Sequence, residues 1–222
     1  MTQFETLYCA AVKKLGGEQQ LLDQMPQVLA DTELREIADD RYLSMMTRCV
    51  FRAGFVWRVI NNKWPGFEAA FDGFNPLVIA HYADEKLEQL AKDERIVRNF
   101  QKIKTVRDNA TFVLELQRQH GGVGNWLADW PGNDVVGLWL ELKKRGSRLG
   151  GNSGPGFLRN MGKDTFMLTG DVSAALVNHG LIDRFSATSK RDLNRVQEVF
   201  NDLQQQSGLP LAHISKVLAF TV

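Results

Sequence analysis

The segment from Leu142 to Lys163 contains the residues whose types and spacing most clearly suggest chemistry. It reads LKKRGSRLGGNSGPGFLRNMGK, with six Lys and Arg residues and no Asp or Glu. Glycines in a tight turn expose backbone N–H groups without obstruction by Cβ atoms. A helix that begins after such a turn adds a positive dipole end. Backbone amides and nearby cations together bind a phosphate without reading base sequence.

This segment therefore predicts a phosphate clamp, although a glycine-rich loop with a solvated basic face fits the same residues. The candidate phosphate-binding residues are Gly150, Gly151, Asn152, Ser153, Gly154, Arg148 and Arg159. Asn152 and Ser153 could equally serve only to shape the turn.

Aromatic residues gather at a helix break around Gly54: they are Phe51, Phe55 and Trp57. Aromatic faces can stack on an unpaired base, but aromatic residues at helical spacing are also ordinary core. Tyr42 and Cys49 lie on one helical stripe nearby, and each could line a pocket or simply pack. A basic set on a later helix reads as a solvated face of mixed charge and is assigned no binding role: it consists of Arg98, Lys102, Lys104 and Arg107.

Almost every segment has the apolar spacing of a helix, so the predicted fold class is all-α. The expected helices cover residues 37–52, 55–61, 76–81, 84–92, 97–119, 126–130, 134–145, 156–161, 172–179, 189–206 and 210–219. We expect Asp84 and Ser189 to cap their helices and Pro210 to occupy the first position of the last one. The run 166–168 alone alternates weakly like a strand.

Composition narrows the function classes. With 222 residues, 44% hydrophobic and 24% charged, the chain is typical of a soluble protein with one core or two small lobes. A net charge of +1 neither requires nor excludes a polyanionic partner. No run of 18 apolar residues and no signal-peptide pattern is present, so we expect a cytoplasmic protein without membrane association.

Two cysteines and four histidines lie far apart in the sequence. Their spacing favours neither a disulfide, an iron–sulfur cluster nor a zinc site. We therefore expect no bound metal and no cofactor.

Two sequence stretches carry a resemblance to a known family. The first, AGFVWRVINNKWPGFEAAFDGFNPLVIA at 53–80, is similar to an A-G-L-S-W stretch followed by a Phe-Asp-Pro turn, and it continues into IVRNFQKIKTVRDNA at 96–110. The second is LKKRG at 142–146, directly before the glycine-rich turn. In this order they resemble the helix–hairpin–helix DNA glycosylases, and most of all the 3-methyladenine DNA glycosylase I family, over residues 37–183.

The resemblance implies one glycosylase-like domain over residues 1–222, built of two helical lobes with the active site in the cleft between them. Residues 142–163 would form the helix–hairpin–helix element. The expected partner is double-stranded DNA with a damaged base, bound by a monomer. Trp57 matches the pocket tryptophan, with Phe51, Cys49 and Tyr42 as further pocket candidates. Phe55 lies near the apolar residue that fills the gap left by the flipped base.

Breaking a glycosidic bond builds positive charge on the sugar, and a carboxylate beside it stabilises that charge and orients water. The superfamily places an aspartate where this chain has Asp171, which makes it the candidate catalytic residue. Asp171 could instead cap the helix at 172–179. Lyase-capable relatives have a lysine where this chain has Pro155 and Gly156, so hydrolysis without strand cleavage is expected.

The chain departs from the family at its pocket. Cys49 stands where the family has a glutamate, four residues before Ala53, and the family's zinc ligands have no counterpart here. The implied function is hydrolytic release of an alkylated purine base. The alternative is a non-catalytic helix–hairpin–helix protein that binds bent or damaged DNA.

Overall fold

The computed structural model describes residues 2–222, and all regular structure in that range is helical. Met1, the first residue of the expected 1–222 domain, lies outside the described residues. Contacts group the chain into two compact units. Unit 1 comprises the N-terminal residues up to Leu29, then 131–138 and 162–222, and unit 2 comprises 30–130 and 139–161.

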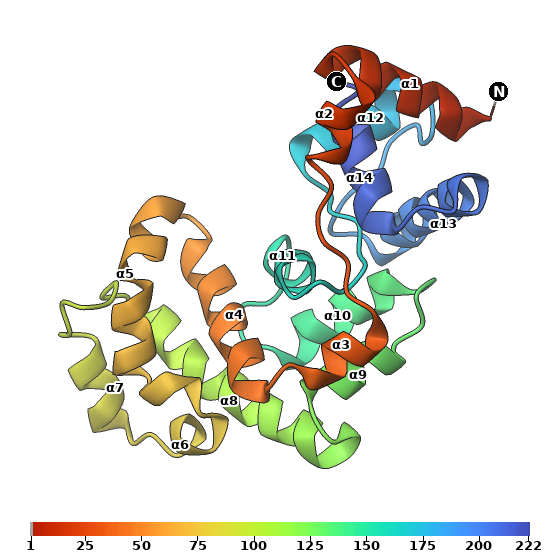
Figure 1. Cartoon of the computed structure of the whole chain (residues 1–222). Coiled ribbons are helices and arrows are strands. Elements are labelled where there is room, and N and C mark those ends of the chain that lie inside the picture. The colour runs from red at the N-terminus through yellow and green to blue at the C-terminus, as the bar shows by residue number, and fades with distance from the viewer. Residues whose placement is uncertain (1) are drawn as a thin grey trace. The chain divides into compact units, whose positions relative to one another are not determined.

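Unit 2 contains most of the helices (Figure 1). They are α3 (Asp31–Glu36), α4 (Asp39–Arg52), α5 (Trp57–Ala70), the 3-10 turn η1 (Asp72–Phe74), α6 (Pro76–Ala80), α7 (Asp84–Leu90), α8 (Phe100–His120), α9 (Val123–Asp129), the greater part of α10 (Val135–Arg145) and α11 (Ser153–Asn160). The long helix α8 is their scaffold, because α4, α6, α7 and α9 all pack against it.

An aromatic stack forms the core between α5 and η1. Trp64 lies 5.0 Å from Phe67 and 5.6 Å from Phe74 by ring centroids, and in both pairs the rings are nearly parallel. Phe71 continues the stack onto Phe74 at 5.6 Å. Because residues 64, 67 and 71 recur at helical spacing, this stack holds α5 helical along its length.

We expected a helix at 55–61 that stops before Pro65 and Gly66, two residues that usually interrupt a helix, and this was wrong. Helix α5 runs through both residues to Ala70. A Cβ atom at Gly66 would lie 2.4 Å from the carbonyl oxygen of Arg95, so this glycine serves a close approach of two backbones. The burial of the aromatic face outweighs the hydrogen bond that proline removes.

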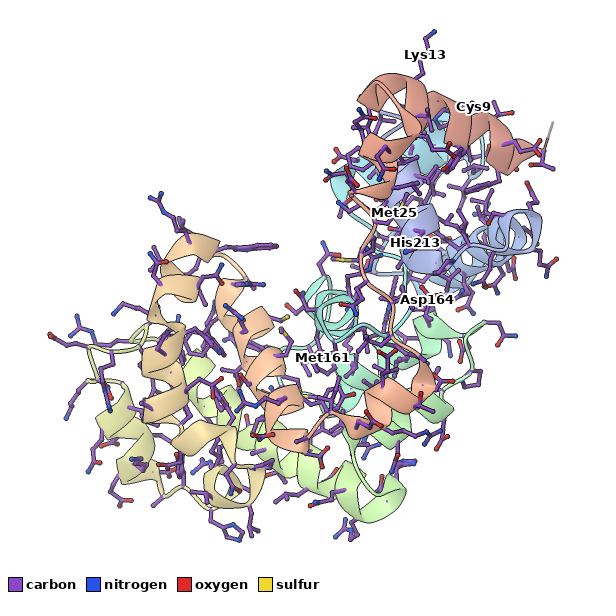
Figure 2. All side chains as sticks on the ribbon, viewed as in Figure 1. Cys9, Lys13, Met25, Met161, Asp164 and His213 are labelled. Carbon is purple, nitrogen blue, oxygen red and sulfur yellow. The ribbon has the colours of Figure 1, made fainter. Side chains whose placement is uncertain are left out.

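Unit 1 contains α1 (Gln3–Leu15), α2 (Glu18–Leu22), α12 (Gly170–Asn178), α13 (Lys190–Ser207) and α14 (Leu211–Ala219). Helix α1 packs on α13 and α14, while α12 packs on α14. Its core includes Phe166 stacked on Phe200 with ring centroids 4.0 Å apart. His213 on α14 bonds the carbonyl oxygen of Pro26 at 3.0 Å and so fixes the segment after α2 (Figure 2).

Helix ends in unit 1 depend partly on distant residues. Ser189 caps α13 as expected, accepting a hydrogen bond from the Asp192 amide at 3.3 Å. Pro210, however, is the N-cap of α14 and not its first residue. The Asp164 carboxylate supplies the missing cap by accepting bonds from the amides of Leu211 at 3.0 Å and Ala212 at 2.8 Å (Figure 2).

Two other local expectations need correction. The run 166–168 forms no strand, because the backbone of Met167 bonds the Ser215 hydroxyl through both its N–H and its carbonyl oxygen. Asp84 is the first residue of α7 and Ala83 is its N-cap. Asp84 instead pairs with Arg107 at 2.8 Å.

Candidate functional site

The turn between α4 and α5 presents apolar side chains to solvent. Gly54 has φ +73°, a left-handed conformation that suits glycine and reverses the chain after α4. Phe55 is 39% exposed, Val56 67% and Trp57 62%. A cluster of large, solvent-exposed apolar side chains is typical of an interaction surface. We call residues 53–57 the aromatic turn.

Lys102 of α8 holds the aromatic turn in place. Its ammonium donates hydrogen bonds to the carbonyl oxygens of Phe51 at 3.2 Å and Ala53 at 2.5 Å. It also lies 4.5 Å from the ring centroid of Phe55. Burial, and then the field of Arg148, lower the pKa of Lys102. The sequence suggested a solvated lysine, which was wrong, since only 6% of Lys102 is exposed and it closes the carboxyl end of α4.

Trp57 already has a cation on one face. The guanidinium of Arg52 lies 5.1 Å from the centroid of the Trp57 ring. A hydrogen bond of 2.7 Å from Arg52 to the side-chain oxygen of Asn61 fixes this position. One face of the indole is therefore taken, and a further ring can stack only on the other.

Arg48 lies one turn before Arg52 on α4 and packs on a second tryptophan, with its guanidinium 5.0 Å from the Trp64 ring centroid. Burial, and then the field of Arg52, lower the pKa of Arg48. The nearby Glu68 is engaged elsewhere, by Arg41 at 3.0 Å and by the Ser44 hydroxyl at 2.7 Å. Although burial raises the pKa of Glu68, these bonds lower it on balance, and the carboxylate stays charged.

Cys49 lies between these two arginines in the sequence and is 8% exposed. Burial raises the pKa of its thiol to about 11, although Arg52 and Arg48 oppose that rise. The thiol is therefore neutral at physiological pH and supplies no negative charge. In this respect it does not replace the glutamate that the family resemblance led us to look for.

Two of the pocket candidates belong to the core. Phe51 is fully buried and packs edge-on against Phe67 with ring centroids 4.7 Å apart. Tyr42 is also fully buried, packs against Phe157, and donates its hydroxyl hydrogen to the Leu34 carbonyl oxygen at 2.7 Å. Neither side chain lines an open surface of unit 2. Both support the α4 helix from within, because an apolar helix stripe is buried wherever a neighbour covers it.

The glycine-rich hairpin joins α10 to α11 through residues 146–152. Arg148 has φ +59° and Gly151 has φ +57°, so the chain turns twice through the left-handed region. Within residues 2–222, the amides of Gly150, Gly151 and Asn152 donate no hydrogen bond. A Cβ atom at Gly154 would lie 2.5 Å from the Leu149 carbonyl oxygen, so that glycine is required by packing.

Asn109 of α8 anchors this hairpin. Its side-chain oxygen accepts the Ser147 amide at 2.7 Å, and its amide group donates to the Ser147 carbonyl oxygen at 3.1 Å. Asn109 is fully buried, so this paired contact is shielded from water. Asn109 lies in the stretch IVRNFQKIKTVRDNA, and its role as an anchor was not predicted from the sequence. Its one signal was an amide side chain among the apolar residues Val106, Ala110 and Val113 of the same helix.

The basic residues around the hairpin have different surroundings. Arg148 is exposed and makes no ion pair among the described residues. Arg145 is held by α8, bonded to Gln119 at 3.0 Å and placed over the Phe112 ring at 5.0 Å. Arg159 and Ser153 lie on α11 and are partly exposed.

Asp171 belongs to unit 1, at the second position of α12. The N-cap is Thr169, whose hydroxyl accepts the Val172 amide at 3.3 Å, so Asp171 does not have the cap role that was its alternative. Asp171 is exposed, and within residues 2–222 its carboxylate has no hydrogen-bond or ion-pair partner. It is thus free to interact with a ligand.

Residues 2–222 hold no cluster of three or more His, Cys, Asp or Glu side chains arranged to bind a metal ion. In that range no helix combines the length and apolar character needed to span a bilayer.

Solved structures share this fold. The 3-methyladenine DNA glycosylase I of Staphylococcus aureus aligns with a TM-score of 0.51 and 20% identity over 65% of this chain and 84% of that one. The Methanocaldococcus jannaschii 8-oxoguanine glycosylase/lyase, solved with DNA containing 8-oxoguanine, aligns with a TM-score of 0.55 and 15% identity over 97% of this chain and 96% of that one. The fold is that of the all-α helix–hairpin–helix DNA glycosylases.

Sequence matches narrow this class. Residues 33–146 match the methyladenine glycosylase family model, which is just over half of the 222 residues. A stretch of 67 residues is 30% identical to DNA-3-methyladenine glycosylase 1 of Escherichia coli (strain K12), covering 30% of this chain and 36% of that relative. The chain therefore belongs to the methyladenine glycosylase family. The family match ends at Gly146, so the hairpin and Asp171 lie beyond it.

Proposed function

We propose that this chain is a monofunctional DNA glycosylase that hydrolyses the N-glycosidic bond of an alkylated purine flipped out of duplex DNA. One observation carries this proposal: α8 fixes both the aromatic turn, through Lys102, and the hairpin, through Asn109. Seven residues separate the two anchors, which is about 10 Å along a helix. Because a strand advances about 3.4 Å per base pair, that spacing is close to three steps of DNA.

Each element then has a role at the duplex. The free amides of the hairpin, with Gly154 and Ser153 at the start of α11 and with Arg148 and Arg159, bind backbone phosphate without selecting sequence. Phe55 enters the gap left by the flipped base, and the open face of Trp57 stacks on the base. Lys102 acts as a positioning residue because its bonds set where the aromatic turn stands.

Asp171 supports the chemical step. As the bond between the sugar and the base breaks, positive charge develops on the deoxyribose, and a carboxylate beside it lowers the energy of that state. The same carboxylate orients the water whose oxygen bonds to the sugar carbon. Pro155, Gly156 and Phe157 stand where a Schiff-base lysine would be needed, so the strand is left uncut.

Mass spectrometry of bases released from duplexes with single lesions tests the proposal. The panel contains 3-methyladenine, 7-methylguanine and 1,N6-ethenoadenine, each opposite its normal partner. We expect release of at least one base, and strand cleavage only after added alkali. Asp171→Asn should abolish release and retain duplex binding. A folded wild-type protein that releases no base from any duplex overturns the proposal.

The same variant decides between enzyme and binding protein. The neutral thiol of Cys49 favours the non-catalytic alternative, whereas the family match opposes it. If Asp171→Asn and the wild type bind lesion duplexes equally and neither releases a base, the binding protein is the correct description. We further propose that the protein acts as a cytoplasmic monomer on damaged duplex DNA, which sedimentation of the complex and cell fractionation can test.

A further inference from the structure

The end of α4 and its surroundings carry four cations without a carboxylate partner. Arg48, Arg52, Lys102 and Arg148 all belong to unit 2, and the described residues provide none of them with an ion pair. The Nε atoms of Arg48 and Arg52 are buried and lack a hydrogen-bond partner. The fields of these groups reach one another, since Arg52 lowers the pKa of Arg48, and Arg148 that of Lys102.

Among the described residues, Glu68 is the carboxylate whose field reaches this cluster, where it raises the pKa of Arg48. That compensation is partial, because the Glu68 carboxylate also bonds Arg41, the Ser44 hydroxyl and the Trp64 indole N–H. The Cys49 thiol is buried and neutral. A ligand at the aromatic turn therefore meets net positive charge.

Arg52 brings that charge directly under the stacking surface. Its guanidinium is 5.1 Å from the Trp57 ring centroid, and a base on the opposite face would lie about 3.5 Å from the indole plane. The cation and the base would then be about 8 to 9 Å apart with the indole between them. Both faces of an indole attract cations, but a cation on the open face is repelled by Arg52 across the ring, so the net attraction there is weaker.

Resting on the proposed function, we propose that the site selects alkylated purines that are neutral in DNA and discriminates against those that carry a fixed positive charge. Alkylation of ring atom N3 of adenine or N7 of guanine leaves such a charge. An etheno ring closed over N1 and N6 of adenine, or a methyl group that replaces the N1 proton of guanine, leaves the base neutral. Arg48 and Arg52 are the specificity-determining residues.

The charge that develops during cleavage of the glycosidic bond also favours neutral bases over cationic ones. When a neutral base leaves, the electron pair of the C1′–N9 bond stays on the purine, the water oxygen bonds to C1′, and a proton released from that water is balanced by protonation of the purine. Nearby guanidinium groups stabilise the negative charge that develops on the purine and remain protonated themselves. A cationic base departs without developing that charge, so the arginines only oppose its binding.

The expected size of this discrimination follows from the distance between the Arg52 guanidinium and the stacked base. One unit charge at about 8.6 Å from another, in an effective dielectric of about 20, changes an equilibrium or rate roughly 20-fold. We therefore expect 1,N6-ethenoadenine and 1-methylguanine to be released at least about 10-fold faster than 3-methyladenine and 7-methylguanine, after correction for their uncatalysed loss. Single-turnover rates on duplexes of one sequence measure this ratio.

Arg52→Gln should lower the neutral-to-cationic ratio about 10-fold. Arg118→Gln is the matched control, because Arg118 is an exposed arginine at the far end of α8, about 24 Å along the helix from Lys102, and should change both rates by the same factor. Arg48→Gln provides a second test if the Arg52 variant does not fold. Faster release of cationic bases, or an unchanged ratio in both cluster variants, overturns this inference alone. No release from any duplex overturns it together with the proposed function.

Discussion

Replacing Lys102 tests the anchor of the aromatic turn. Lys102→Met keeps the length and apolar stem of the side chain but removes two hydrogen bonds, to Phe51 and Ala53. A hydrogen bond from a charged donor contributes about 1.5–3 kcal/mol, so two contribute about 3–6 kcal/mol. The cost of burying the ammonium offsets part of this. We expect a net loss of about 2–4 kcal/mol in the free energy of unfolding.

Two assays test the role of Lys102: one measures stability, and the other measures how firmly the aromatic turn is held. Thermal unfolding should show a lower melting temperature, by roughly 5–10 °C for a chain of this size. Limited chymotrypsin digestion should cut faster at Phe55, because the turn is no longer tied to α8. Lys104→Met is the matched control, since Lys104 is an exposed lysine on the same helix. Equal melting temperatures and equal digestion rates in the two variants would refute the reasoning.

Three further predictions concern Asn109, Cys49 and Gly151. Asn109→Ala removes both bonds to Ser147 and should cost about 2–3 kcal/mol in urea unfolding while weakening duplex binding; unchanged stability would contradict this. At pH 8 the native protein should react quickly with a disulfide reagent at exposed Cys9 only, because a pKa of about 11 leaves about one in a thousand Cys49 thiols ionised, and labelling of Cys49 should rise toward pH 11. In Gly151→Asp the new Cβ meets no atom within 4 Å, and Asp tolerates the left-handed φ of +57° at a modest cost in stability, so the variant should fold yet lose at least about 10-fold in duplex affinity. Normal affinity would rule out a phosphate at this turn.

Local pattern was sufficient for most helices. The stripe of α4, which contains Tyr42 and Cys49, was visible because helical periodicity depends only on neighbouring residues. The expected helix at 97–119 ends one residue before α8 does for the same reason, since the glycine that follows at 121 stops a helix by itself. Pattern could not tell that the stripe is buried completely, which depends on the helices packed over it.

The sequence by itself also determined the family and the position of the glycine-rich hairpin. Only the tertiary structure decided which groups the charged side chains contact. Lys102 is 49 residues from Ala53 in the chain, and packing alone brings it to the end of α4. Arg52 and Trp57 are close in sequence, but whether a guanidinium covers an indole depends on side-chain geometry, here fixed by Asn61. The role of a charge depends on which partners surround it, and in this protein packing brings together partners that are distant in sequence.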